Sequence, residues 1–296
     1  MNEYYRKTVW TRLFDVFNAI LMCLFMLTIL FPFWNQLCIS LSDISITPVS
    51  NITFYPQHFN TEAYQRVFSD VRIVRATGVS VLRVLVGTVG TLFCTGLLAY
   101  VTTIQWFSGR KLLRRAFVVT MYFGAGLIPT YLAFISIGLY NTFWVMVLPF
   151  SVSVSNIIVA RTFFQNSLPG ELWDAAQVDG CGNLRFFFTM ALPLSKAVIS
   201  VIALWTAVGQ WNSYFNALIY IRDSNLHPLQ LIMRNILITN QSFAALGTGE
   251  AAIIAMRKAN LVRYSMIIVS TVPIMCVYPF IQKYFDQGVM IGSVKG

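Results

Sequence analysis

The chain has 296 residues, of which 57% are hydrophobic and only 11% are charged, and its mean hydropathy is +0.66. Soluble domains carry roughly 25% charged residues, so this composition excludes an ordinary soluble protein and indicates a membrane protein in contact with lipid. The net charge of +10 is accounted for by basic residues that flank membrane spans and implies no nucleic-acid partner.

Six apolar segments are long enough to cross a hydrocarbon core of about 30 Å. They lie near Val16–Gln36, Val79–Ile104, Ala116–Ile137, Phe143–Phe163, Ser195–Ile221 and Val262–Phe280. Backbone groups cannot stay unpaired in hydrocarbon, so we expect helices, and the continuous apolar runs lack the alternation of a membrane barrel. The sequence predicts one all-α integral membrane domain, residues 1–296, with six transmembrane helices.

The first apolar segment is preceded by basic residues, as a secretory signal would be. Its apolar run is too long for a signal, and Leu37–Ser40 is a poor cleavage site, so we expect a retained helix. The short basic cluster Arg110–Arg115 should lie in the cytoplasm, which places both termini there as well. Arg83, near the outer end of the second span, is expected to extend to the membrane interface.

Two longer segments, near Cys38–Gly78 and Arg222–Leu261, are predicted to lie outside the membrane. The apolar spacing in Leu229–Ile238 predicts a short amphipathic helix close to the outer surface. The five cysteines and two histidines are scattered without ligand spacing, which predicts neither a metal site nor a disulfide framework.

No set of residues has the pattern of a catalytic site. The predicted spans hold hardly any ionisable residues, which argues against a secondary transporter with an ion-coupling relay and against a membrane-embedded enzyme. A phosphate-binding loop of the G-x-x-x-x-G-K type is also missing from the sequence. We therefore predict no catalytic residue and no bound cofactor, and any energy for transport must come from another subunit.

A polar stretch, residues 164–194, separates the fourth and fifth predicted spans. Ser167 is predicted to cap a helix with Pro169 in its first turn, where proline is tolerated and where the helix dipole favours Glu171. Trp173, Ala176 and Gln177 share one face by their spacing. The small Ala175 would let a partner approach closely, and Gly180 and Gly182 end this helix.

The second half of this stretch, Phe186–Leu192, is predicted to form an apolar helix against the membrane bundle, with Pro193 opening the fifth span. Two interpretations remain for the whole hairpin. It either binds a partner protein, or it is an amphipathic pair of helices that lies in the membrane surface.

The residue pattern of the hairpin favours a partner. Asp174-Ala175-Ala176, three residues, Gly180, nine residues, Met190, one residue and Leu192-Pro193 resemble the EAA loop of bacterial ATP-binding-cassette (ABC) importer permeases. That family has the pattern E-A-A, three residues, G, nine residues, I-x-L-P. The chain departs from it at Asp174 and Met190, two mild changes at unchanged spacing.

The resemblance extends over nearly the whole chain. Gly138–Trp144, Arg161–Phe164 and Gln210–Leu218 are similar to carbohydrate-importer permeases of the maltose type, which have a type I importer fold. Pro228–Gln230 and the ending Lys283–Gly296 resemble the LplC/YtcP-like branch, whose members are associated with complex oligosaccharides and polysaccharide fragments.

The resemblance implies an inner-membrane permease that pairs with a second homologous permease, two ATPase subunits that bind ATP and Mg²⁺, and an external solute-binding protein. It implies that the helix around Asp174 docks on an ATPase. The residues expected to couple to that ATPase are Glu171, Asp174, Ala175, Ala176, Gln177, Gly180, Leu192 and Pro193. The tail, residues 282–296, is expected to reach the ATPases through Gly288, Gly292 and Lys295, the alternative being a frayed terminus.

The fifth predicted span is unusually polar. Trp205, Gly209, Asn212, Tyr214, Asn216 and Tyr220 are the candidate substrate path, most of them repeating at helical spacing, with Tyr131 and Asn156 as further candidates. Amides and aromatic faces bind sugars, but amides also hold membrane helices together. The sequence predicts an oligosaccharide cargo, and an amino acid, a polyamine or phosphate remains the alternative.

Overall fold

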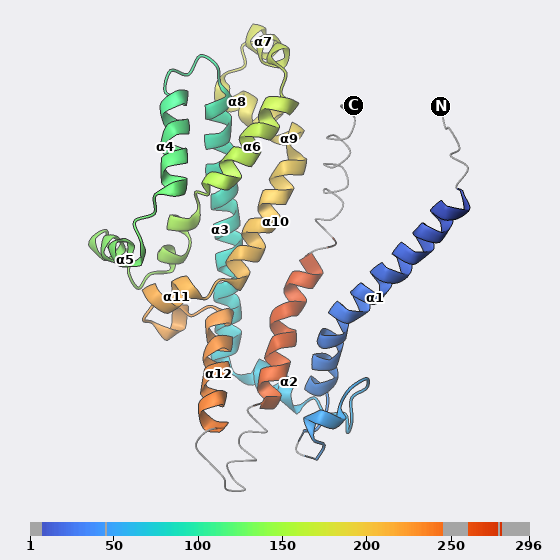
Figure 1. The fold of residues 1–296 in the computed structure, drawn as a ribbon. Coiled ribbons are helices and arrows are strands. Elements are labelled where there is room, and N and C mark those ends of the chain that lie inside the picture. Colours follow the sequence, from blue (N-terminus) through green and yellow to red (C-terminus); the bar gives the residue numbers. More distant parts are fainter. Residues whose placement is uncertain (1–7, 45, 245–259, 278, 280–296) are drawn as a thin grey trace. The chain divides into compact units, whose positions relative to one another are not determined.

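The computed structural model describes residues 8–44, 46–244, 260–277 and 279 (Figure 1). Within these residues the chain is almost entirely helical, with one isolated antiparallel bridge, Ser42 to Phe59, and no β-strand. The predicted all-α class is confirmed. The α-helices are α1 (Val9–Ser40), α2 (Glu62–Ser69), α3 (Val71–Thr103), α4 (Arg110–Tyr122), α5 (Leu127–Ser136), α6 (Val154–Ser167), α7 (Gly170–Val178), α8 (Asn183–Phe186), α9 (Leu192–Leu194), α10 (Lys196–Asn212), α11 (Phe215–Tyr220), α12 (Leu229–Ala244) and a final helix Asn260–Val277.

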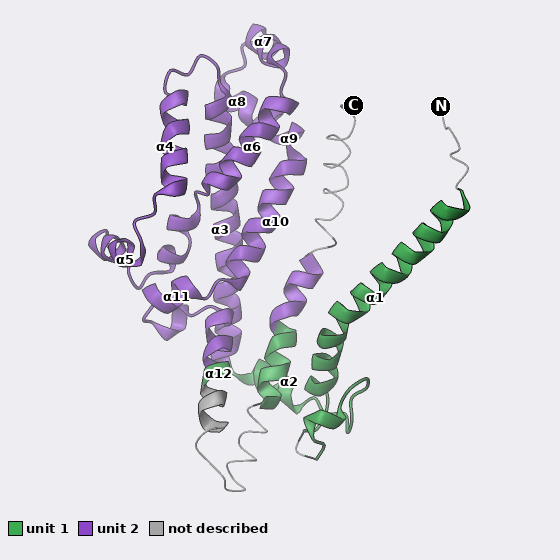
Figure 2. Ribbon diagram, in the orientation of Figure 1, with its two compact units in different colours: residues 1–70, 236–269 green, residues 71–235, 270–296 purple. Residues whose placement is uncertain are grey.

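The contacts of the chain gather in two compact units (Figure 2). Residues 1–70 and 236–269 form unit 1, and residues 71–235 and 270–296 form unit 2. In unit 1, the segment after α1 folds back on the end of that helix. Trp34 Nε1 donates to the Phe54 carbonyl at 2.8 Å and Asn35 Nδ2 donates to the Ile52 carbonyl at 2.9 Å. A small buried cluster around Ile39 and Ala63 completes this unit.

Unit 2 is built around α3, which packs against α6 and α10. At 33 residues, α3 is about 50 Å long and exceeds the thickness of a hydrocarbon core. Its buried face carries small and polar residues such as Ser80, Gly87 and Thr91. Small side chains let membrane helices approach closely, because the association rests on van der Waals packing and hydrogen bonds between helices.

The two ends of unit 2 differ in structure (Figure 1). At one end, α7 and α8 lie near the start of α4, so the hairpin and the basic cluster Arg110–Arg115 share that end. At the other end, the 3₁₀ turn η2 (Phe143–Met146) packs against α11. Asn141, at a φ of 57°, ties this second end together, because its Oδ1 accepts from the backbone N–H groups of Arg222 and Asp223 at 2.8 Å each.

The predicted count of six continuous spans is not confirmed. Among the described residues, three helices are long and apolar enough to cross a membrane, α1, α3 and Asn260–Val277, and two bent helix pairs raise the number to five. The predicted span Ala116–Ile137 is instead divided into α4 and α5. Gly126 interrupts it because it adopts a φ of 81°, a conformation that glycine favours and that no helix continues through.

The fourth and fifth predicted spans are bent. The turns Phe143–Phe150 meet α6 at 44°, where Ser153 caps α6 by accepting from the Asn156 N–H at 3.4 Å. The segment Asn183–Leu194 meets α10 at 83°. The fifth span then ends early, at Asn212, and the chain starts again as α11. At this last break the Ser213 carbonyl lies beyond the end of α10 and accepts a hydrogen bond from Arg83.

The amphipathic helix predicted over Leu229–Ile238 is present as the first part of α12. The end of the predicted sixth span and the tail of residues 282–296 lie outside the described residues, and with them Gly288, Gly292 and Lys295.

Candidate functional site

The hairpin of residues 169–193 begins with α7. The predicted cap, Ser167, is wrong: Ser167 is the last residue of α6, and Pro169 is the N-cap of α7. Glu171 lies in the first turn as predicted, where the partial positive charge of the helix N-terminus stabilises a carboxylate. Gly180 has a φ of 70°, just beyond the C-cap Asp179, so a glycine there permits the chain to reverse.

Aromatic side chains fasten the hairpin to α3. The Trp173 ring meets the Phe186 ring edge-on, with 4.8 Å between the ring centroids. The ring centroid of Tyr100, on α3, lies 6.2 Å from that of Phe186 and 5.3 Å from that of Phe187. Ala176 is 2% exposed and faces the same cluster, so its methyl group packs inward. Because these contacts are close-packed, a displacement of α7 must also displace the end of α3.

The opposite side of α7 is uncovered. Glu171, Asp174, Ala175 and Val178 recur at three- and four-residue intervals and are all exposed, Val178 at 89%. We call these four residues the exposed stripe of α7. An exposed valine beside two carboxylates is unusual for a surface that only meets water, and it suits a protein partner with basic and apolar groups. The remaining predicted coupling residues lie beside this stripe or behind it: Gln177, Gly180 and Pro193 are exposed and Leu192 is half-buried.

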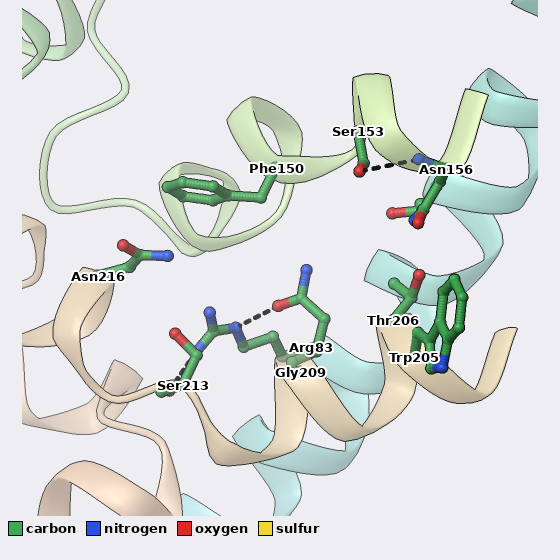
Figure 3. Close-up of a pocket in the computed structure, with 11 residues that line it drawn as sticks. Arg83, Phe150, Ser153, Asn156, Trp205, Thr206, Gly209, Ser213 and Asn216 are labelled. Atoms are coloured by element: carbon green, nitrogen blue, oxygen red, sulfur yellow. Dashed lines mark hydrogen bonds between the residues drawn. The ribbon is translucent and has the colours of Figure 1, made fainter. Parts of the chain in front are cut away.

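Unit 2 also contains a polar cavity of about 340 Å³ (Figure 3), a size typical of ligand sites. The residues that line it come from α3, α6, α10, α11 and the turn before α6: Arg83, Thr91, Phe150, Ser153, Asn156, Trp205, Thr206, Gly209, Gln210, Ser213 and Asn216. Figure 3 shows Arg83 between Ser213 and Asn216 on one side and Trp205 and Thr206 on the other.

The cavity contains three of the six predicted path residues, Trp205, Gly209 and Asn216, together with the additional candidate Asn156. The single stripe predicted from Trp205 to Tyr220 is wrong, because α10 ends at Asn212 and the later positions belong to another helix. The other path residues lie elsewhere. Asn212 is exposed, Tyr214 lies under Arg234 at 5.5 Å, and Tyr220 is buried against Tyr131 and Phe134.

Arg83 differs most from its prediction. The expected position at the membrane interface is wrong, since Arg83 is 1% exposed. The reason is that α3 begins at Val71, so Arg83 lies about 18 Å along the helix axis. Its Nε donates to Gln210 Oε1 at 2.8 Å, and its Nη1 donates to the Ser213 carbonyl at 2.7 Å. That carbonyl is free because α10 has already ended.

Comparison with known proteins decides the family. No protein-family model matches the sequence. The chain is 38% identical over 285 residues to protein LplC of Bacillus subtilis, covering 96% of both chains. It is 34% identical over 289 residues to the polygalacturonan/rhamnogalacturonan transport system permease protein YtcP of Bacillus subtilis, covering 96% of this chain and 99% of that one. The chain belongs to the ABC sugar-transport permeases.

A solved structure agrees. The permease matches, with a TM-score of 0.82 and 26% identity, a chain from the crystal structure of a bacterial ABC transporter involved in the import of the acidic polysaccharide alginate. The match covers 96% of this chain and 100% of the other. The type I importer fold and the membrane location of the permease follow from these similarities.

Sequence reasoning missed several residues of the cavity of this permease, above all Arg83 and Thr91. The signal for Arg83 was its charge within an apolar span, since ionisable residues inside membrane segments face the interior and have a function as a rule. Thr91 gave no such signal, because threonine is common in membrane helices and its burial depends on which face of α3 meets α10.

Gly87 of α3 tests the packing around the cavity. A Cβ at Gly87 would lie 3.0 Å from Gln210 Nε2 and 3.1 Å from Gln210 Cδ, and Gln210 cannot move away without losing its bond to Arg83. We expect Gly87→Ala to lower the free energy of unfolding by about 1 kcal/mol, because overpacking outweighs the gain in helix propensity.

The matched control is Gly78→Ala in the same helix, where the added Cβ meets nothing within 4 Å. It should raise stability by up to about 1 kcal/mol through helix propensity alone. Thermal unfolding of the two variants in detergent measures both effects, and equal shifts would contradict the predicted contact.

Proposed function

We propose that this permease forms half of the translocation path of an ATP-driven importer for an oligosaccharide, and that the polar cavity is part of that path. The observation that carries the proposal is the set of groups in the cavity. Trp205 offers an aromatic face, Asn156 and Asn216 offer amides, and Thr91 and Thr206 have buried hydroxyl groups with no hydrogen-bond partner among the described residues. Hydroxyl groups of a sugar would supply the missing partners.

The charge of the cavity lining also favours some of the possible cargoes over others. Among the described residues, this lining contains one charged side chain, Arg83, and no carboxylate. A cationic polyamine is therefore disfavoured, because a buried positive charge would repel it. An ion-coupled secondary mechanism is disfavoured for the same lack of Asp and Glu. Named relatives are permeases for arabinooligosaccharides and for melibiose, raffinose and stachyose, which supports a saccharide.

We propose that the energy of ATP hydrolysis reaches the permease through the hairpin. The exposed stripe of α7 would dock on a cytoplasmic ATPase subunit, with Asp174 facing a basic residue of that subunit. In this scheme the chain itself is not an enzyme, and ATP and Mg²⁺ are bound by two partner ATPases. The scheme also includes a second permease, an external solute-binding protein, cytoplasmic termini, and tail contacts through Gly288, Gly292 and Lys295. The basic cluster Arg110–Arg115 at the hairpin end supports a cytoplasmic position for that end.

Two threonines on α3 provide a test of the path. Thr91 and Thr95 are each 1% exposed, and neither hydroxyl group has a hydrogen-bond partner among the described residues, but only Thr91 lines the cavity. In the complete importer reconstituted in proteoliposomes, we expect ATP-dependent uptake of a labelled oligosaccharide. Thr91→Val should lower that uptake about fivefold, the equivalent of one hydrogen bond to the cargo, whereas Thr95→Val should leave it unchanged.

Labelled amino acid, putrescine and inorganic phosphate are the comparison solutes. Uptake of one of these in place of every oligosaccharide would overturn the proposed cargo. An equal loss in the two threonine variants would show that the hydroxyl groups matter to the helix and not to the path.

A further inference from the structure

Arg83 is a buried cation that has no anionic partner among the described residues. It is 1% exposed, and its partners are the neutral oxygens of Gln210 and Ser213. In the part of the chain that the structure describes, Arg83 forms no ion pair, and no Asp or Glu lines the cavity. Burial of an ion without a counter-charge is costly, so a purely structural link between α3 and α10 would be served better by a neutral side chain.

We infer that Arg83 binds a carboxylate of the cargo, so that this permease favours an acidic sugar such as a uronate over a neutral one. The inference rests on the proposed function and assigns the charge recognition to one residue of the same cavity. An incoming carboxylate would provide the missing negative charge, and it would lose its own hydration in a site that already holds a cation.

The geometry of the guanidinium suits this role. A guanidinium has five N–H donors, and the bonds to Gln210 and Ser213 use Nε and Nη1. One acceptor is the Gln210 side chain on α10, and the other is the Ser213 carbonyl just beyond the end of that helix. Together the two bonds fix the plane of the guanidinium. The remaining donors are available to a planar, bidentate acceptor, which is the geometry that arginine and a carboxylate share. Lysine, a point charge, would not provide this orientation.

The neighbours of Arg83 favour a sugar acid over a small inorganic anion. Trp205 and Phe150 present aromatic faces, and Asn216 presents an amide, within the same cavity (Figure 3). A phosphate ion would leave these groups unused, whereas a uronate unit uses the charge through its carboxylate and the other groups through its ring and hydroxyls. Inorganic phosphate is nevertheless a necessary arm of the test.

The test compares a labelled oligogalacturonate with its methyl ester in the complete reconstituted importer. Uptake by each variant is expressed relative to the unmodified permease with the same probe, so that the preference of the solute-binding protein cancels. We expect Arg83→Gln to lower uptake of the oligogalacturonate at least tenfold and to change uptake of the ester less than twofold. Arg75→Gln is the matched control, because Arg75 lies on the same helix but is exposed and outside the cavity lining.

A second variant guards against a folding defect in the first. Gln210→Glu would place a carboxylate on the present partner of Arg83 and neutralise it from within. We expect it to lower oligogalacturonate uptake while ester uptake persists. A loss of both probes to the same degree in the two variants would assign Arg83 a structural role and overturn the inference.

Two further outcomes separate the inference from the proposed function. If the unmodified permease imports the neutral ester or other neutral oligosaccharides but not the oligogalacturonate, the inference fails and the oligosaccharide path stands. If it imports inorganic phosphate and no oligosaccharide, both fail.

Discussion

Asp174→Lys is expected to abolish the stimulation of ATP hydrolysis by cargo and solute-binding protein in the complete importer. Asp174 is exposed on α7, between Glu171 and Val178, and it is not part of the aromatic cluster on the other side of the helix. Reversal of a charge that becomes paired on docking costs about 2–5 kcal/mol, which corresponds to roughly 30-fold or more weaker binding of the ATPase subunit. The hairpin itself should remain folded, because Trp173 and Ala176 anchor it from the other side.

Two variants make this result specific. Asp174→Glu keeps the carboxylate and should leave the stimulation unchanged. Asp179→Lys reverses an exposed charge at the C-cap of α7, outside the exposed stripe, and should have a small effect. Co-purification of the ATPase with each variant and the rate of ATP hydrolysis in proteoliposomes are the measurements. Normal stimulation in Asp174→Lys would remove the docking role of the stripe.

Phe187→Ala is expected to loosen the hairpin from α3 and to destabilise unit 2 strongly. Phe187 is 1% exposed, and its ring lies 5.3 Å from Tyr100. The ring also closes the space over Gly96, where an added Cβ would come within 3.3 Å of it. Removal of a buried phenyl ring costs about 3–5 kcal/mol, since the cavity that it leaves cannot collapse fully.

The adjacent residue provides the control. Phe188 is 52% exposed, so Phe188→Ala should cost much less although the change in composition is the same. Thermal unfolding in detergent reports the stability, and trypsin cleavage after Arg185, which is exposed within the hairpin, reports its attachment. We expect faster cleavage and a lower unfolding midpoint in Phe187→Ala alone, and similar behaviour of the two variants would contradict the anchoring role of Phe187.

Much of the hairpin could be predicted from the sequence, because its determinants are local. The first-turn position of Glu171 and the chain reversal at Gly180 depend on residues within a few positions of each other. Even so, the cap was misplaced by two residues, from Pro169 to Ser167, because proline can begin a helix as its N-cap or as its first residue. The inward position of Ala176 could not be predicted in this way, because it depends on the aromatic cluster, which only the tertiary structure shows.

The helix breaks were harder to foresee. Apolar composition alone made Ala116–Ile137 and Ser195–Ile221 look continuous, since hydrophobicity measures whether a segment enters lipid and not whether it stays straight. Gly126 is exposed and breaks the helix through its own φ of 81°, whereas the break after Asn212 is stabilised from α3. A carbonyl freed in such a break is tolerated only where another group satisfies it, and Arg83 does so for Ser213.

Composition by itself determined that this is a membrane protein, and the short-range spacing in the hairpin carries its resemblance to the EAA loop of ABC importer permeases. The tertiary structure decided where the cavity lies and which residues line it. Arg83 and Gln210 are 127 positions apart in the chain, yet Arg83 Nε lies 2.8 Å from Gln210 Oε1. Their pairing depends on where α3 begins, where α10 ends and how closely the two helices pack at Gly87, and these distant conditions leave no local pattern in the sequence.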